Sequence, residues 1–336
     1  MKSRNFIAMV LVASILGFGF LSKERKEAPS DNYVADVLFS LGEPKPDHYI
    51  ENSSPELIKK GRELIFSGRT TNPKGRKSKY ISKFFKCTSC HNTVKEEAIL
   101  TQTDPESRFQ YAEENDLPFL QASTFYGIVN RETWYNDDYV KKYGDLVKPA
   151  RNSLKESIQL CAKECSQGRY IEDWEMEAVL AYFWSIGLKE SDAGGPYNID
   201  IYSMPEDFTK EDLVVFIKGN YLKKSPATFG EVPKNKTEGY PGLVGDPVRG
   251  LQIYNRSCQH CHREKGESDV VLDFSVPTLN WLKKNITSDS QLSIYEVIRK
   301  GTYSEKGHRE YMPLYTKEKL SDQQIEDLRA FIELER

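Results

Sequence analysis

Cys87-Thr88-Ser89-Cys90-His91 and Cys258-Gln259-His260-Cys261-His262 are the two stretches of this chain that decide its fold. Each has the pattern Cys-x-x-Cys-His, which is the attachment motif of c-type haem. The two thiols bond to the two haem vinyl groups, and the adjacent histidine is the proximal ligand of the iron. The sequence therefore predicts two covalently attached c-type haems, held by Cys87, Cys90, Cys258 and Cys261, with His91 and His262 as iron ligands.

The same cysteine spacing also occurs in zinc sites and in thiol–disulfide oxidoreductases. A structural zinc site needs four ligands, and a redox Cys-x-x-Cys lies beside a βαβ pattern. The sequence pattern shows neither feature, so haem attachment is favoured. His260 lies inside the second motif, but the order of the motif assigns the iron to His262, and we interpret His260 as a polar spacer.

Length and composition are typical of globular domains. The chain has 336 residues, which is enough for two domains, and 38% of them are hydrophobic. Lys and Arg total 47 against 50 Asp and Glu, which gives a net charge of −3. Because nucleic-acid-binding domains carry a basic excess, we expect no nucleic-acid partner.

The N-terminal segment indicates export. Lys2 and Arg4 precede an apolar run over residues 6–21, and a charged stretch follows at residues 23–27. A basic start followed by an apolar run is typical of a secretory signal, and the run is slightly short of a comfortable membrane span. We expect residues 1–22 to be a signal peptide or a single membrane anchor, and the remainder to lie in the periplasm, where covalent haem is attached.

The rest of the chain reads as a degenerate duplication of one helical unit. Ser54-Pro55 and Asp246-Pro247 both combine a helix cap with proline at the first helical position. The amphipathic stretches at 177–183 and 326–332 resemble each other and close the two copies.

We predict a mainly α fold with two cytochrome c-like helical domains in tandem. Its parts are the signal or anchor (1–22), a tether (23–54), domain 1 with the first haem (55–190), a linker (191–245) and domain 2 with the second haem (246–336).

The second iron needs a sixth ligand, and Met312 is the candidate. It lies in Tyr311-Met312-Pro313, before the closing helix of domain 2, where small cytochromes c place a methionine loop. A methionine opposite histidine raises the haem potential and suits electron transfer. The alternative is a methionine that fills a gap in the core.

Domain 1 has no such methionine before its last helix and instead has Cys161 and Cys165. Met176 belongs to the helix pattern, and Met204 follows it in the linker as a remote candidate. Three interpretations of the cysteines remain open. They form a disulfide, as an oxidising compartment favours, they are two buried thiols, or one thiolate is the axial ligand of the first iron.

The stretch from Leu154 to the closing helix of domain 1 resembles a known family. Leu154, Ile158, Cys161 and Gly168, followed by Met176, match the first domain of di-haem thiosulfate dehydrogenases. The stretch is also similar to the haem-bearing subunit of the Sox thiosulfate-oxidising system. The resemblance implies that Cys161 is the axial ligand of an active-site haem and its catalytic residue. It further implies that the Met312 domain accepts the electrons.

Three departures from that family stand out. The family usually has Ser-Met-Asn-Gly where this chain has Cys165-Ser166-Gln167-Gly168. A long insertion separates Gly61 from Cys87, whereas Gly250 lies close to Cys258. The stretch at residues 126–136 has no clear counterpart. These differences bear on the substrate more than on the haem architecture.

Three functions fit the motifs. The first is electron transfer through two haems in series, with another cytochrome or a quinol-linked complex as redox partner. The second is an oxidoreductase acting on thiosulfate or tetrathionate, with Cys161 at the reacting centre and a small sulfur anion held by Arg131, Arg151 and Arg169. The third is a di-haem peroxidase, for which His48 is the spare histidine near domain 1, although it fits the tether better. Electron transfer ranks first because the motifs alone suffice for it.

Overall fold

The computed structural model describes residues 31–193, 208–302 and 310–334. The described chain is mainly helical and contains no β-strand beyond two isolated bridges, which confirms the predicted α class. The predicted signal or anchor at 1–22 and Met204 lie outside the described residues. Among the helices that the structure describes, none combines the length and the apolar character needed to cross a membrane.

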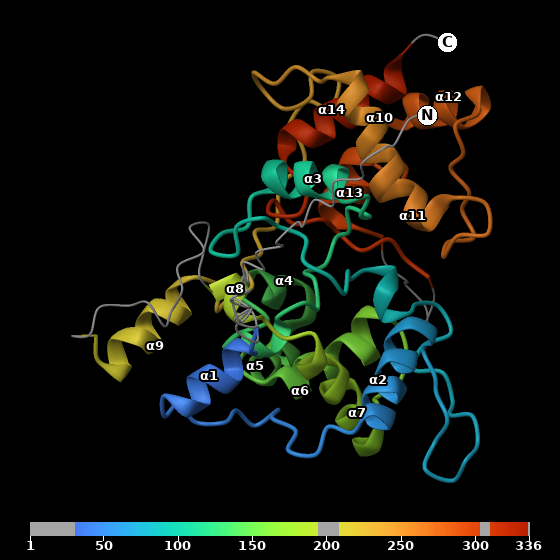
Figure 1. Ribbon diagram of the computed structural model, residues 1–336. Helices are drawn as coiled ribbons and strands as arrows, with labels where there is room; N and C mark the ends of the chain where they lie inside the picture. Colours follow the sequence, from blue (N-terminus) through green and yellow to red (C-terminus); the bar gives the residue numbers. More distant parts are fainter. Residues whose placement is uncertain (1–30, 194–207, 303–309, 335–336) are drawn as a thin grey trace, which may run out of the picture. The chain divides into compact units, whose positions relative to one another are not determined.

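Helices α2 (Pro55–Ser67) and α7 (Asp173–Ser185) form the first helix pair. As predicted, Ser54 caps α2, with its Oγ accepting from the backbone N–H of Leu57 at 3.2 Å, and Pro55 is the first helical residue. The helices pack against each other (Figure 1). They meet at Gly61, where an added Cβ would lie 1.9 Å from the carbonyl oxygen of Ala178. Only glycine permits this close crossing.

Helices α10 (Pro247–Ile253) and α14 (Asp322–Glu333) form the second pair and repeat the geometry of the first. An added Cβ at Gly250 would lie 1.9 Å from the carbonyl oxygen of Asp327 and 2.8 Å from Cβ of Phe331. At Gly61 the corresponding neighbours are Ala178 and, also at 2.8 Å, Cβ of Tyr182. The sequence likeness between 177–183 and 326–332 thus corresponds to two helix crossings of the same kind.

The remaining helices are short and connect or cover these pairs. Their bounds are α1 Val34–Ser40, α3 Pro105–Glu114, α4 Val140–Tyr143, α5 Val147–Arg151, α6 Leu154–Leu160, α8 Glu190–Ala193, α9 Lys210–Gly219, α11 Gln259–His262, α12 Val276–Asn285 and α13 Ile294–Lys300. The described residues from Asn32 onward belong to one compact unit.

The segments expected as tether and linker contain packed structure. Val34 of α1 is 1% exposed and packs in one cluster with Ile217 of α9 and Tyr221. His48 is also buried, stacked on Trp184 with ring centroids 5.7 Å apart. Stretches without a clear amphipathic period at the sequence level therefore still contribute to the core.

Helix α3 lies in the first half of the sequence but packs with the second helix pair. Phe109 of α3 and the nearby Phe119 belong to the same buried cluster as Tyr254 and Phe331. Gln324 of α14 donates a hydrogen bond to the carbonyl oxygen of Pro105 at 2.8 Å. Domain 1 therefore supplies part of the core around α10 and α14, which the linear division of the sequence did not anticipate.

Candidate functional site

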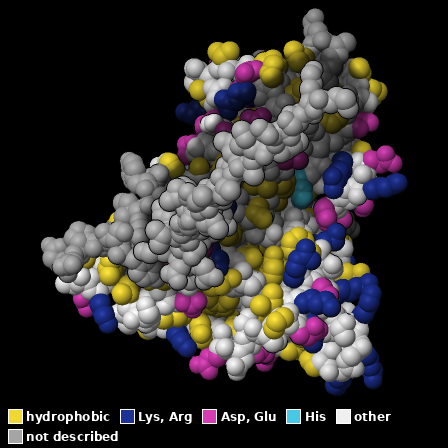
Figure 2. All heavy atoms as spheres, in the orientation of Figure 1, with side chains coloured by type: hydrophobic (Ala, Val, Ile, Leu, Met, Phe, Trp, Pro, Cys, Tyr) yellow, Lys and Arg dark blue, Asp and Glu magenta, His cyan; other side chains and the backbone are white. Residues whose placement is uncertain are grey.

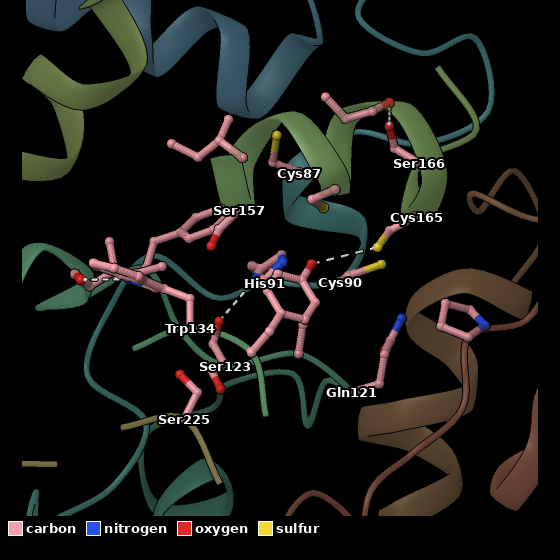
Figure 3. Close-up of a pocket in the computed structure, with 18 of the residues that line it drawn as sticks. Cys87, Cys90, His91, Gln121, Ser123, Trp134, Ser157, Cys165, Ser166 and Ser225 are labelled. Atoms are coloured by element: carbon pink, nitrogen blue, oxygen red, sulfur yellow. Dashed lines mark hydrogen bonds between the residues drawn. The ribbon is translucent and has the colours of Figure 1, made fainter. Parts of the chain in front are cut away.

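The first Cys-x-x-Cys-His motif lines a cavity of about 210 Å3 (Figure 3). Cys87, Cys90 and His91 of the motif line it, and so do Cys161 and Cys165. Its apolar walls include Leu64, Ile65, Phe125, Ile128, Val179 and Phe183. Large apolar walls with a few placed polar groups are what a flat organic cofactor needs.

His91 is oriented as an iron ligand. Its Nδ1 lies 2.6 Å from the carbonyl oxygen of Ser123, so the Nδ1–H must donate and Nε2 carries no proton. The ring stacks on Phe125 at 4.2 Å between centroids. Burial lowers the pKa of His91 to about 4, which keeps the ring neutral at physiological pH. The first motif and its cavity therefore fit a covalently attached haem with a neutral histidine ligand.

The second motif has the same arrangement around His262. Its Nδ1 lies 2.7 Å from the carbonyl oxygen of Val270, which again leaves Nε2 for a metal. Cys258 and the predicted ligand Met312 both pack against the cluster that contains Tyr254. Two hydrogen bonds with Thr302 hold the backbone of Met312, at 2.7 and 2.8 Å. The thiol and the thioether thus share one apolar environment, as a second haem would require.

The two motifs touch each other. His260 Nε2 lies 3.3 Å from the carbonyl oxygen of Thr88, and the Cys261 sulfur lies 3.8 Å from that of Ser89. Ser89 Oγ also donates to Glu267 at 3.1 Å. The spacer residue His260 therefore joins the motifs, a role that sequence reasoning did not identify.

Cys161 and Cys165 form a single π-helical turn after α6. All six cysteines are free thiols in this structure, so these two are not joined as a disulfide. The Cys161 thiol donates a hydrogen bond to the Cys165 sulfur, which raises the pKa of Cys161 and lowers that of Cys165 to about 7. Cys165 thus has the more thiolate-like sulfur, although the family resemblance points to Cys161.

A group of tyrosines surrounds Cys165 and was not found from the sequence. Cys165 Sγ lies 3.2 Å from the Tyr143 hydroxyl and 3.7 Å from that of Tyr135. Tyr311, next to the predicted ligand Met312, donates its hydroxyl to the backbone carbonyl of Cys165 at 2.7 Å. The chain segment that carries Met312 therefore also contacts the cavity of the first motif.

Of the three arginines proposed as an anion clamp, the structure places Arg131 at the cavity. Arg151 forms an ion pair with Asp137. Arg169 pairs with Glu175 at 2.7 Å and also donates to backbone carbonyls. The prediction of an anion clamp is therefore wrong for Arg151 and Arg169, because nearby carboxylates already bind both side chains.

His48 does not line the cavity, so it does not serve as a distal acid or base there. It is 2% exposed, and its Nε2 lies 3.1 Å from the carbonyl oxygen of Val129.

A buried charged group lies between the regions of the two motifs. Glu96 pairs with Arg108 at 3.2 Å and with Lys319 at 3.0 Å, and all three side chains are almost fully buried. Lys319 also lines the haem cavity. The next residue, Glu97, lines a second, smaller cavity with Arg131 and Lys319, and burial raises its pKa to about 7.

Helical folds with a haem-attachment motif and a following methionine loop define a c-type cytochrome. Residues 247–334 match the sequence model of the family Cytochrome c. The match supports a c-type cytochrome with covalently bound haem iron that takes part in electron transfer. A search among curated proteins gave no match to this chain. Over the described residues, no group of three or more His, Cys, Asp or Glu is placed to hold a metal ion by itself, as the zinc alternative would need.

Proposed function

We propose that this chain is an exported di-haem c-type cytochrome that passes electrons between two covalently bound haems in series. The observation that carries the proposal is the contact between the two attachment motifs. Thr88 and Ser89 of the first motif lie against His260 and Cys261 of the second. Since the motif residues bond to the haem edges, this contact favours rapid electron exchange between the cofactors.

The duplicated helix crossings support two tandem cytochrome c-like domains. Gly61 and Gly250 each bring a first helix against the carbonyl group of a last helix, with the same distances. Each crossing lies beside one motif, and each motif histidine donates its Nδ1–H to a backbone carbonyl. The haem would supply one-electron chemistry at each site, while the protein fixes the ligands and excludes water.

The exported location and the partners follow from the N-terminal sequence and the redox chemistry. Residues 1–22 favour export to the periplasm, with or without retention as an anchor. A one-electron carrier there needs a redox partner, such as another cytochrome or a quinol-linked complex.

A second function, oxidation of thiosulfate or reduction of tetrathionate, is favoured by the placement of Cys161. This thiol lines the same cavity as His91, and Arg131 lies there as a cation for an anionic substrate. Cys161 would provide the sulfur that meets the substrate, and Arg131 would offset the substrate charge. The second haem would then receive the electrons.

Haem content tests the main proposal. Purified wild-type protein should contain two covalent haems per chain in a pyridine haemochrome assay, and either C87A/C90A or C258A/C261A should contain one. A wild-type value of one haem per chain would refute the di-haem proposal.

Reduction of the protein by added thiosulfate tests the proposed enzymatic activity. It should occur in the wild type and be absent in Cys161→Ala. Low-temperature electron paramagnetic resonance tests the ligand, since a thiolate-ligated low-spin signal should disappear in Cys161→Ala. A wild-type spectrum without a thiolate signal would refute ligation of the first iron by Cys161.

A further inference from the structure

We propose that Cys161 and Cys165 are a third redox centre, a dithiol that closes to a disulfide when the two haem irons take its two electrons. The inference rests on the proposed di-haem function. It goes beyond that function because it assigns covalent chemistry to the second thiol.

The backbone places the two sulfurs side by side. Cys161 and Cys165 span a π-helical turn, in which the N–H of Ser166 bonds the carbonyl of Cys161 at 2.8 Å. Such turns are rare and concentrate at functional sites. They also shorten the rise between residues four positions apart compared with an α-helix. Both thiols line the same cavity, and each is the first cause of the other's pKa shift, so the turn brings the two sulfurs into mutual contact at the cavity wall.

The surroundings hold the turn and the side chain of Cys165. The hydroxyl groups of Tyr143 and Tyr135 lie 3.2 and 3.7 Å from its sulfur and hold the side chain at the cavity wall. The backbone is fixed from outside, because Tyr311 bonds the Cys165 carbonyl and Ser82 bonds the Ser166 carbonyl at 2.5 Å. Closure of the disulfide therefore leaves the cavity wall in place.

The electron count matches the cofactors. Two S–H bonds break, one S–S bond forms, two protons leave, and two electrons go one each to two ferric irons, which become ferrous. Both thiols line the cavity of the first motif, so the first iron is the entry point. An iron bound at the first motif would take one electron, and the contact between the motifs would let an iron bound at the second motif take the other.

The sequence offers a direct test because Lys163 lies between the two cysteines. Trypsin cuts the reduced chain into peptides 156–163 and 164–169, whereas a disulfide keeps these peptides linked. Wild-type holoprotein is reduced with dithionite, desalted, reoxidised with ferricyanide, alkylated and digested. We expect two alkylated peptides before reoxidation and one linked pair after it. Alkylation of both thiols after reoxidation would overturn the proposal.

A reductive titration provides the second readout. The oxidised wild type should take up about four electron equivalents per chain, two at the haems and two at the disulfide, and Cys165→Ser should take up about two. Haem content, measured on the same samples, separates the two proposals. Two haems with unlinked peptides overturn only the dithiol, and one haem overturns the di-haem function itself. Should Cys165→Ser fail to fold, the wild-type peptides alone decide.

A second inference comes independently from the insertion between Gly61 and the first motif. Residues 69–86 contain seven Lys and Arg residues and no Asp or Glu. Six of these cations are exposed, namely Lys74, Arg76, Lys77, Lys79, Lys83 and Lys86. Figure 2 shows Lys and Arg side chains gathered over the loop that follows α2. In the described part of the chain, only Lys86 among these six forms an ion pair, with Glu267.

We infer that this basic loop docks an acidic redox protein. The loop has a defined turn conformation, because Asn72 Oδ1 accepts hydrogen bonds from the backbone N–H groups of Lys74 and Arg76, both at 3.0 Å. It leads directly into Cys87, so a docked partner lies near the first haem site. In a chain of net charge −3, a local cluster of this size attracts an acidic surface and raises the association rate.

Electron transfer to oxidised plastocyanin, an acidic copper protein, tests the loop. The second-order rate should fall with added salt in the wild type and should fall about tenfold in K74E/R76E/K77E at low salt. The control K148E/K283E/K284E changes three exposed lysines elsewhere and should lose less. Equal rates in the wild type and the loop variant would overturn the inference. The inference would also be overturned if the wild type sedimented with phosphatidylglycerol vesicles, the loop variant did not, and their electron-transfer rates were equal. That result would identify a membrane as the partner.

Discussion

Replacement of Glu96 by glutamine should destabilise this protein more than any surface charge change. The Glu96 carboxylate is 4% exposed and pairs with Arg108 and Lys319, whose side chains are 1% and 6% exposed. It also accepts from the backbone N–H of Thr124 and from Asn92, each at 3.1 Å. Glutamine keeps the size but leaves two buried cations without the carboxylate that they share. Breaking a buried pair in this way costs about 3–5 kcal/mol.

The assay is urea denaturation of holoprotein at pH 7, followed by tryptophan fluorescence. The matched control is Lys148→Gln, which breaks an exposed pair with Asp145 and should cost less than about 1 kcal/mol. If Glu96→Gln lowers the free energy of unfolding no more than Lys148→Gln does, the buried group does not stabilise the fold and the reasoning fails.

The pH dependence gives a second check of the same side chain. Burial alone would raise the pKa of Glu96, but Arg108 and Lys319 outweigh it and hold the pKa well below its ordinary value of 4.5. The stability from this ionised carboxylate is present above pH ~4.5 and is lost as the pH falls toward the folded pKa. Glu96→Gln should therefore lose less stability than the wild type between pH 5 and pH 3. Parallel curves for the two proteins would contradict this assignment.

Three further perturbations follow from the structure. Gly250→Ala should destabilise the protein by more than about 2 kcal/mol in thermal or urea unfolding, because the new Cβ would lie 1.9 Å from a backbone oxygen of α14. In the control, Gly219→Ala, the new Cβ meets open space, so that variant should be as stable as the wild type or more stable. Phe109→Ala should cost about 3–5 kcal/mol, and a loss below 1 kcal/mol in the same assay would show that α3 is not part of the second core. Because burial raises the pKa of Glu97 to about 7, the stability from its neutral form is present below pH ~4.5 and is lost as the pH rises through 7. Glu97→Gln should remove this loss, measured as urea midpoints at pH 5.5 and 8.5, and an unchanged difference between those midpoints would count against the burial of Glu97.

Local signals made part of this molecule predictable. The Cys-x-x-Cys-His motifs report covalent chemistry that needs no tertiary information, and Ser54-Pro55 specifies its own helix start through one cap hydrogen bond. The likeness between the two closing helices also indicated a duplicated unit, and the structure shows matching helix crossings at Gly61 and Gly250. The motifs and the helix cap depend on residues a few positions apart, and a duplication appears as a repeated pattern, so all three are visible in a single sequence.

Features that depend on long-range contacts were not predictable in the same way. Nothing near Tyr311 in the sequence shows that its hydroxyl reaches Cys165, and nothing near Lys319 shows that it pairs with Glu96. Arg151 and Arg169 were misassigned for another reason, since each pairs with one of several nearby carboxylates and the sequence does not say which. A charged or hydroxyl side chain has many sterically equivalent partners, and only the tertiary structure selects among them.

The position of α3 has a consequence for how the protein is made. Its apolar side chains, among them Phe109, find their partners on α10 and α14, which are synthesised last. During synthesis from the N-terminus, this surface stays exposed until the final helix has emerged, and exposed apolar surface promotes aggregation. The first half of the chain therefore cannot finish folding alone. A gene split between the two motifs would yield an N-terminal fragment that keeps its own core but leaves the apolar face of α3 exposed until it binds the second fragment.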